Sequence, residues 1–493
     1  MSKKILYSSL IVSIGVLLGR LMGFVREASL ASTFGVSSEA DIAVLALTIP
    51  DILVSLLVAG GLSAALIPEF KSLSTQQMRA LFVQVSFFSI VFFIALALFL
   101  GYVTEPLTYL FAPGLGASAA SSAQEILRQV FWLIPLTVLA GVTTAYLQSQ
   151  GKFVAPAMGT FIFNACVVLG LVTFVNDSKR LDVLVYFILL GGLARWLSQL
   201  WVMRSELQFH DSFSSMLIHK DLLVRYGQAV VAMGLFTLFP VVARSFASFS
   251  GEGGVAMMNY AWRLVELPLG LVITVLAVVL FPKLAELHAQ RDEDGFDRQL
   301  HEGLAWSLLL AAAIMGPILA APEVFVSVVY GWGDNIASEK MDTISMLLQV
   351  GIVSLPFQAV LAMCVAAFNA RKRTKVPMMI SFVGFVLLIP ICWLAEVYFA
   401  LFGAVSAIVA CYIAVSGVLL FVLRKECKSM PILSLFRVPT VVLILTFSST
   451  LISMSFGLSE LVNISACLLI MVLSVLLTLV NKVGVDYVLN LIR

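Results

Sequence analysis

Charged residues stand inside long apolar stretches of this sequence, at positions where a charge is costly to bury. The clearest examples are Arg20, Arg26, Glu27, Arg263 and Glu266. Arg20 and Glu27 are two helical turns apart and share nearly one helix face. Arg263 and Glu266 have the spacing of a helical ion pair. Because a guanidinium group binds phosphate oxygens through a planar fork of N–H donors, these residues predict binding of a phosphate-bearing molecule.

Composition indicates that these charges are embedded in lipid. Of the 493 residues, 61% are hydrophobic and 12% are charged, against about 45–50% and about 25% in typical soluble domains. The mean hydropathy is +1.04, so the chain must satisfy its backbone polar groups internally, as membrane-spanning segments do. The apolar runs are long and continuous, as in 85–100, whereas a membrane barrel has short alternating segments. We expect an all-α polytopic membrane protein, which excludes a soluble enzyme, a disordered chain and an extracellular module.

Apolar runs long enough to cross a bilayer number about fourteen, at about 20 residues for each span. Basic residues gather in alternate loops, most densely over 371–375, while the opposite loops contain only Lys179, Arg180 and Lys340. By the positive-inside rule, the basic loops and both termini are cytoplasmic, and the number of spans is even.

A weak internal repeat divides these spans. Residues 66–71 resemble 280–284, and residues 148–156 resemble 369–377. One duplicated unit of six helices predicts two pseudo-symmetric lobes of the same orientation, related by an axis along the membrane normal. The expected regions are a first lobe, a second lobe and an appended helix pair, at 1–206, 207–425 and 426–493.

The charged parts of the two predicted lobes stand at equivalent places. Two cationic helices facing each other across the lobe axis would form a positive cavity, where a low dielectric strengthens the attraction for an anion. Structural roles remain open for the same residues. Arg26 could be an interfacial anchor or the partner of a neighbouring acid, and Arg263 with Glu266 could be a self-neutralising pair.

Three further charges are less specific candidates. Asp41 begins the second apolar run and is a candidate helix cap or gating acid. Asp51 follows Pro50 in the same run and is a candidate cavity acid. Arg244, near the outer end of the seventh run, is a candidate for the cavity mouth. A structural role explains each of them at least as readily.

No catalytic constellation, phosphate-cradling loop or metal-ligand spacing stands out. Five of the six cysteines lie in apolar runs, and the four histidines lie in polar loops. The sequence therefore predicts a transporter without a cofactor, not an enzyme, which runs on a cation gradient, on the membrane potential or downhill. The basic run 371–375 is expected to set orientation and to contact lipid headgroups, and nothing in it indicates nucleic-acid binding.

The segment from Gly19 to Gly35, GRLMGFVREASLASTFG, resembles the first-helix signature of the MurJ/MviN family of peptidoglycan lipid II flippases. This family lies within the multidrug/oligosaccharidyl-lipid/polysaccharide exporter superfamily. Other matching segments, in chain order, are Asp41, Ile49 to Asp51, Ile67 to Phe70, Phe111 to Gly114, Arg263 to Pro268 and Thr374 to Pro377.

The resemblance implies fourteen helices, two six-helix lobes around a cationic cavity, and a groove in the last helix pair that suits a polyprenyl tail. It implies that Arg26 and Arg263, with Arg20 nearby, bind the substrate diphosphate. Asp41 and Glu266 also match family residues implicated in function, so the expected cavity or gating acids are Asp41, Asp51, Glu266 and Glu27.

The second helix departs from the family pattern. The family usually reads Pro-Asn-Leu-Leu-Arg-Arg followed by Ala-Glu-Gly, whereas this chain has PDILVS at 50–55 and VAG at 58–60. An arginine of the cavity cluster and a nearby acid are therefore missing, which leaves the exact glycan open.

The expected function is translocation of a polyprenyl-diphosphate-linked glycan, lipid II first, from the cytoplasmic to the periplasmic leaflet of the bacterial inner membrane. The alternatives are flipping of another lipid-linked oligosaccharide for an exported polysaccharide, ion-coupled antiport of small molecules or ions, and the activity of a membrane-embedded glycan polymerase or ligase. The expected partners are an undecaprenyl-diphosphate-linked glycan, membrane lipids, and the cell-wall or polysaccharide synthesis machinery.

Overall fold

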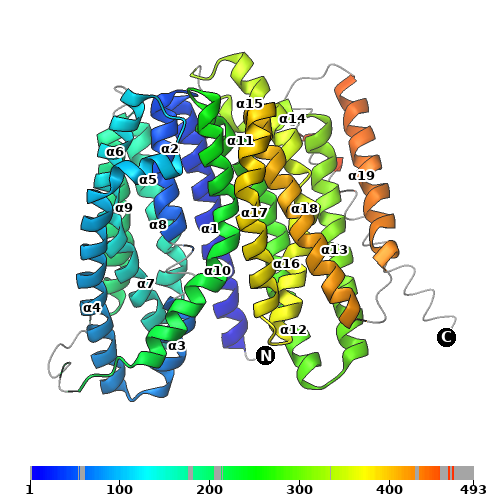
Figure 1. The fold of residues 1–493 in the computed structure, drawn as a ribbon. Coiled ribbons are helices and arrows are strands. Elements are labelled where there is room, and N and C mark those ends of the chain that lie inside the picture. The colour runs from blue at the N-terminus through cyan, green and yellow to red at the C-terminus, as the bar shows by residue number, and fades with distance from the viewer. Residues whose placement is uncertain are drawn as a thin grey trace. The chain divides into compact units, whose positions relative to one another are not determined.

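The computed structural model describes residues 3–53, 55, 62–175, 181–204, 213, 215–332, 335–427 and 432–455, with five single positions from 465 to 473. The elements over these residues are helical, without a β-strand among them (Figure 1). Nine of the described helical stretches are long and apolar enough to cross a membrane, or ten if the helix pair α15 (Ser338–Ile352) and α16 (Leu355–Ala370), bent by 41°, is one span. The predicted all-α membrane fold is confirmed. The count of fourteen stays a prediction, since most residues beyond 455 lie outside the described part of the chain.

Two compact units divide the chain. The first contains Met1–Asn259 with Gly333–Ile336 and Glu396–Ala404, and the second contains the rest. The described helices of the first unit are α1 (Lys3–Phe34), α2 (Ser38–Leu53), α3 (Ser63–Ser72), α4 (Thr75–Tyr102), α5 (Thr104–Phe111), α6 (Ala117–Val130), α7 (Leu133–Ser149), α8 (Val154–Gly170), the π-helix η2 (Leu171–Val175), α9 (Leu181–Val202), α10 (Lys220–Ala247) and the 3-10 helix η3 (Ser248–Ser250).

The helix α11 (Gly254–Pro268) begins in the first unit and continues in the second. The helices that follow are the π-helix η4 (Leu269–Ile273), α12 (Thr274–Ala289), α13 (Glu293–Ala320), α14 (Pro322–Tyr330), α15 (Ser338–Ile352), α16 (Leu355–Ala370), α17 (Lys375–Phe399), α18 (Leu401–Glu426) and α19 (Ile432–Ser455). This division follows contacts and not the repeat, so the three expected regions stay a prediction.

Local sequence signals explain where several helices begin. Ser74 caps α4 in a capping box with Gln77, in which each side chain accepts a hydrogen bond from the other residue's backbone N–H. The Asp292 carboxylate accepts a hydrogen bond from the Gly295 N–H, at 2.8 Å, and so caps α13. From Phe87 to Leu100, α4 is apolar apart from Ser89, and Phe92 and Phe99 on it are exposed. A helical stretch that is almost wholly apolar and exposes its aromatic rings is typical of a span in contact with lipid.

Glycines bring α1 against α8 in the first unit. Gly15, Gly19 and Gly23 recur every four residues along α1, which places them on one face. A Cβ atom on Gly15 would lie 2.6 Å from the Ala157 Cβ atom, and one on Gly23 would lie 3.2 Å from the Asn164 Nδ2 atom. Small residues at this spacing allow helices to approach closely in lipid, where no hydrophobic force drives them together. The stripe therefore fixes which residues of α8 face the charged part of α1.

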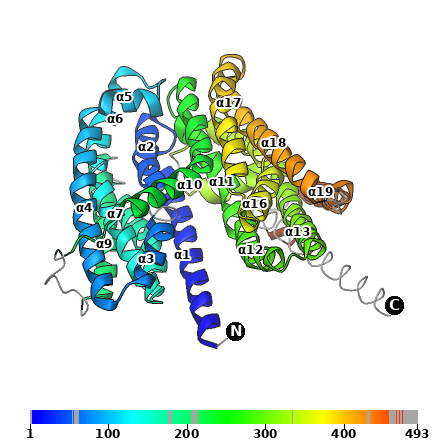
Figure 2. The ribbon, with the colours of Figure 1, turned by 60° about the horizontal axis from the view of Figure 1, so that its bottom comes forward.

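In the second unit, α19 packs against α13 (Figure 1, Figure 2). Gly316 of α13 makes this contact close, since a Cβ atom there would lie 2.0 Å from the Thr446 Oγ1 atom of α19. The helix α19 belongs to the expected appended pair, and its contacts show that it is bound to the second unit.

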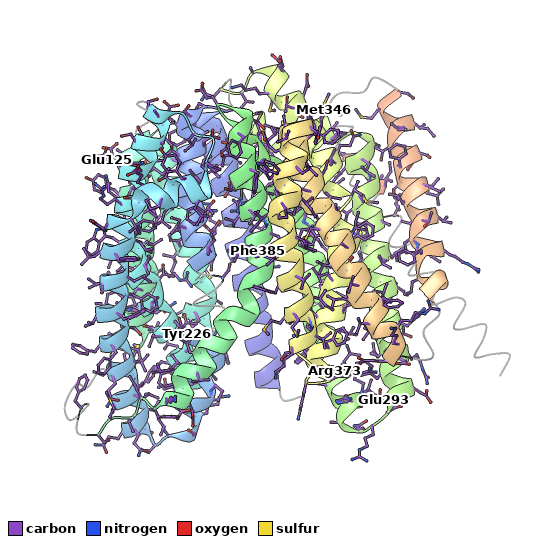
Figure 3. The ribbon with its side chains drawn as sticks, in the orientation of Figure 1. Glu125, Tyr226, Glu293, Met346, Arg373 and Phe385 are labelled. Carbon is purple, nitrogen blue, oxygen red and sulfur yellow. The ribbon has the colours of Figure 1, made fainter. Side chains whose placement is uncertain are left out.

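An ion cluster ties together helix ends of the second unit. Arg371, after α16, is 7% exposed, and its guanidinium nitrogens lie 2.9 Å from Glu293, 3.2 Å from Glu426 and 3.7 Å from Asp297. Arg373 also pairs with Glu426, and Figure 3 shows Arg373 and Glu293 at the same end of the unit. Arg371 was expected to contact lipid headgroups. The structure differs because three carboxylates from α13 and α18 surround it.

The glycine stripe makes a testable prediction. We expect Gly15→Leu to lower the stability of the protein by about 1–3 kcal/mol, because the larger side chain must push α1 away from α8. The measurement is the midpoint of thermal unfolding in detergent, followed by size-exclusion chromatography of the heated protein. The control is Gly227→Leu in α10, since a Cβ atom on Gly227 meets no atom within 4 Å. Equal midpoints for the two variants would show that the stripe is not a packing interface.

Candidate functional site

Arg26 is the centre of a buried polar network in the first unit. Its side chain is only 3% exposed, and its Nη2 atom lies 2.7 Å from the Glu27 Oε1 atom. On the other side, its Nη1 and Nη2 atoms donate to the two carboxylate oxygens of Asp51 at 3.3 Å and 3.0 Å. The Nη1 atom also donates to the Asn164 Oδ1 atom of α8 at 3.1 Å. Arg26 is therefore a buried, ion-paired residue, and it does not act as an interfacial anchor.

Two amide side chains hold this arrangement in place. The Asn164 Nδ2 atom donates to the backbone oxygen of Gly19 at 3.2 Å, which orients the amide toward Arg26. The Asn259 Nδ2 atom of α11 donates to the Glu27 Oε2 atom at 2.8 Å. Glu27 thus accepts from an arginine through one oxygen and from an amide through the other, which satisfies a carboxylate that is 3% exposed.

A second arginine joins the network from α10. The Arg244 Nη1 atom donates to the Asn259 Oδ1 atom at 2.8 Å and to the Thr48 Oγ1 atom of α2 at 3.2 Å. Its Nε atom donates to the Pro240 backbone oxygen at 3.2 Å. Arg244 was expected at the mouth of a cavity, and the structure shows it joined to Glu27 through Asn259.

Charges of both signs meet in the network. Among the residues that the structure describes, these contacts join two guanidinium groups, Arg26 and Arg244, with two carboxylates, Glu27 and Asp51. Such pairing is required because an unpaired charge buried in a low dielectric costs several kcal/mol. Exposure is uneven, since Asp51 is 35% exposed whereas Arg26 is 3% exposed. Asp51 is therefore far more accessible than the arginine it holds.

Asp41 has a structural role in this unit. Its side chain is 0% exposed, and its two carboxylate oxygens accept hydrogen bonds from the backbone N–H groups of Gly253 and Ala256 at 2.8 Å and 2.7 Å. An acid at this place satisfies N–H groups in the first turn of α11 and complements the helix dipole. Asp41 is a helix cap, as one of its two sequence interpretations proposed, but for α11 and not for its own helix.

Arg20 differs from Arg26 in its surroundings. It lies on α1 about a turn and a half before Arg26, and its side chain is half-buried. Within the described part of the chain, no hydrogen bond or ion pair engages its guanidinium group. The guanidinium group of Arg20 is thus less enclosed than that of Arg26.

Arg263 and Glu266 form the expected pair in the second unit. The Arg263 Nη1 atom lies 2.9 Å from the Glu266 Oε2 atom, and the two side chains are 23% and 33% exposed.

The surroundings of this pair are distinctive. The adjacent Trp262 ring stacks on Tyr412 of α18, with centroids 6.1 Å apart and planes at 9°. After Pro268, the chain continues as the π-helix η4, which interrupts the regular helix between α11 and α12. Such an interruption often marks a functional segment.

The network contains residues that the sequence analysis did not identify: Asn164, Asn259 and Thr48. The signal was present, because an amide inside an apolar run needs partners as an ionised group does. The expected meeting of Arg26 and Arg263 in one chamber stays a prediction, since these residues belong to different units, each described by itself.

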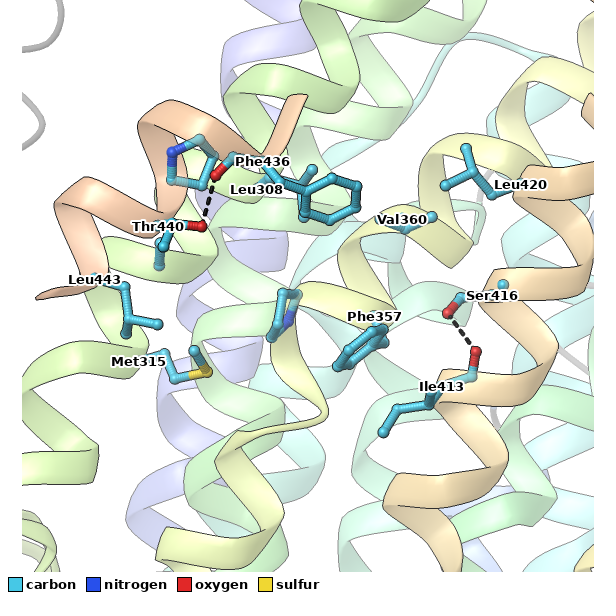
Figure 4. Close-up of a pocket in the computed structure, with 14 residues that line it drawn as sticks. Leu308, Met315, Phe357, Val360, Ile413, Ser416, Leu420, Phe436, Thr440 and Leu443 are labelled. Carbon is cyan, nitrogen blue, oxygen red and sulfur yellow. Dashed lines mark hydrogen bonds between the residues drawn. The ribbon is translucent and has the colours of Figure 1, made fainter. Parts of the chain in front are cut away.

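An apolar groove of about 310 Å³ lies in the second unit among α13, α16, α18 and α19 (Figure 4). Its walls include Met315, Phe357 and Leu443, while Ser416 and Thr440 are among its few polar residues. The Thr440 hydroxyl donates to the Phe436 backbone oxygen at 2.7 Å, and the Ser416 hydroxyl donates to that of Ile413 at 3.2 Å. Both hydroxyl groups are thus bonded within their own helices, so the groove suits a hydrocarbon chain.

Comparisons with known proteins agree with this architecture. A probable lipid II flippase MurJ of Buchnera aphidicola subsp. Acyrthosiphon pisum is 26% identical over 384 residues, which cover 75% of this chain and 74% of that protein. A probable lipid II flippase MurJ of Aquifex aeolicus is 25% identical over 421 residues, covering 85% and 83%.

Solved structures show the same fold. A lipid II flippase MurJ in an inward closed conformation superposes with a TM-score of 0.83 at 20% identity, covering 96% of this chain and all of that one. An inward-facing MATE family transporter of the MOP superfamily gives a TM-score of 0.72 at 14% identity, covering 85% and 98%. A family model described as lipid II flippase MurJ matches residues 30–481. The chain therefore belongs to the lipid II flippase MurJ family.

Proposed function

We propose that this protein moves a polyprenyl-diphosphate-linked glycan, lipid II in the first place, from the cytoplasmic to the periplasmic leaflet of the bacterial inner membrane. Family membership supports the substrate class. The observation that carries the proposal is Arg26, a guanidinium group 3% exposed inside a helical membrane unit. An ionisable residue held at such a cost within a span is typical of a substrate pathway.

The charged residues would bind the diphosphate. Arg20 is half-buried, while Arg26 and Arg263 are each paired with an acid in this conformation. Such pairing would keep the site charge-balanced between cycles, and a guanidinium fork can change from a carboxylate to a phosphate with little change in geometry. Arg20, Arg26 and Arg263 are thus the proposed ligands of the diphosphate, and Glu27 and Glu266 are their counter-ions.

The groove of the second unit would hold part of the polyprenyl tail. Its lining is almost wholly apolar, and its two hydroxyl groups are bonded to their own helices. Because lipid is itself apolar, the groove would select the tail by shape and packing and not by burial from water. This proposal gives α19, part of the expected appended pair, a function in transport.

Transport would proceed by alternating access, with both termini in the cytoplasm. We propose that the cycle uses a cation gradient or the membrane potential and no bound cofactor. Its product would be delivered to the enzymes that build the cell wall.

One observation favours a second substrate class. Asp51 lies beside Arg26, and the family's second-helix arginine is replaced in the sequence by Val54 or Ser55. With a carboxylate beside Arg26, the site attracts anions less than a cluster with an excess of arginines would. A lipid-linked oligosaccharide for an exported polysaccharide is therefore the alternative cargo.

Removal of Arg263 tests the headgroup site. We expect Arg263→Ala to reduce lipid II flipping by tenfold or more, because loss of one partner of a charged hydrogen bond costs about 2–5 kcal/mol. The assay uses proteoliposomes with fluorescent lipid II and an impermeant quencher that reports the outer leaflet. Arg128→Ala is the control. The Arg128 side chain is exposed, and within the part of the chain that the structure describes its one hydrogen bond runs from the Nε atom to the Gly101 backbone oxygen, at 3.2 Å. Normal flipping by Arg263→Ala would exclude Arg263 from the site.

Filling the groove tests the tail site. Gly417 lines the groove, and a Cβ atom on it meets no atom within 4 Å, so a side chain can begin there and Gly417→Phe would place a ring in the groove. We expect flipping of full-length lipid II to fall several-fold, while an analogue with a short prenyl chain is moved at the normal rate. Gly227→Phe, in the first unit, serves as the control. An equal effect of Gly417→Phe on both substrates would argue against a tail site.

A further inference from the structure

We propose that Asp51 is a built-in competitor for the substrate phosphate at Arg26. The carboxylate occupies the guanidinium fork in the absence of substrate, gives it up when a diphosphate binds, and takes it back to expel the diphosphate. This inference rests on the proposed function and assigns a regulatory role to one acid of its site.

The geometry of the pair supports competition. Both oxygens of Asp51 accept from Arg26, one from Nη1 at 3.3 Å and one from Nη2 at 3.0 Å. Two parallel N–H to oxygen hydrogen bonds are also what a guanidinium group offers to a phosphate. The two anions would therefore use the same donors in the same plane, and they cannot use them together.

The other acid of Arg26 is not exchangeable in this way. Glu27 is 3% exposed, and its second oxygen accepts from Asn259 at 2.8 Å, so its removal would leave buried donors without acceptors. Asp51 is 35% exposed and follows Pro50, which lies inside α2. A proline inside a helix removes one backbone hydrogen bond, so this part of α2 has one bond fewer to break when it rearranges. The accessible acid thus lies where the helix lacks one of its own hydrogen bonds.

Exchange of one anion for another is useful to a transporter. Among the described residues, Arg26 has two carboxylate partners, Glu27 and Asp51. A diphosphate that displaces Asp51 takes over its place, so the buried guanidinium group keeps a second anion beside Glu27 throughout the exchange. The net affinity is then the difference between the phosphate and the carboxylate pairs. A small difference permits release, whereas an uncontested arginine would retain the diphosphate.

The test measures binding of inorganic pyrophosphate to the full-length protein in lipid nanodiscs, by equilibrium dialysis. Asp51→Asn keeps the shape of the side chain and removes its charge. We expect it to tighten pyrophosphate binding about tenfold, and we expect the double variant Arg26→Ala/Asp51→Asn to lose this gain. The matched control is Glu39→Gln, the same change at an exposed position of the same helix, which should bind as the unmodified protein does.

Transport kinetics provide the second readout. Competition predicts that Asp51→Asn lowers both the KM and the maximal rate of lipid II flipping, since the diphosphate binds more tightly and leaves more slowly. Pyrophosphate binding by Asp51→Asn that is unchanged, weaker or undetectable would overturn the inference.

Failure of the inference and failure of the proposed function give different results. If the unmodified protein flips lipid II and Asp51→Asn changes neither binding nor kinetics, only the competitor role is wrong. If Asp51→Asn tightens pyrophosphate binding but the unmodified protein moves no lipid-linked diphosphate, the competition is supported and the proposed cargo is wrong.

Discussion

The burial of a guanidinium ion in an apolar helical unit is the constraint on which the rest of the first unit depends. Arg26 is 3% exposed, and a charge at that depth is tolerated only when acceptors surround it. Glu27 and Asp51 supply the opposite charge, and Asn164 supplies a neutral acceptor. Asn259 donates a hydrogen bond to Glu27 and accepts one from Arg244, which joins Arg244 to the network. The buried members of the network thus supply one another with hydrogen-bond partners.

Close helix packing is what makes this network possible. Asn164 can reach both Arg26 and the Gly19 backbone only because α1 lies against α8 along its glycine stripe. In lipid, such packing must come from shape and from polar contacts, since lipid chains are as apolar as leucine. The same principle applies in the second unit, where Gly316 lets α19 approach α13 beside the apolar groove. One unit thus offers buried charge and the other offers a hydrocarbon site, the two chemistries of a lipid-linked diphosphate.

The acids of the site divide into structural and exchangeable groups. Asp41 is fully buried and caps α11, so it supports the helix that supplies Asn259 to the network. Glu27 is fixed from both sides, whereas Asp51 remains accessible. Position in sequence did not separate these three acids, because all of them begin, end or interrupt apolar runs. Their hydrogen-bond partners, which come from distant segments, separate them.

The sequence by itself determined that most of the protein lies in lipid, which fold class it has and which family it belongs to. Long apolar runs require helices in lipid, and the pattern around Arg26 and Arg263 is specific enough to indicate the MurJ family, which the family match confirms. It also identified most charged residues of the site, since a charge in an apolar run is visible without coordinates. Only the tertiary structure decided their partners. The contacts of Asp51, Asn164 and Asn259 join residues 25 to 232 positions apart, and such pairings depend on helix packing that no local pattern encodes.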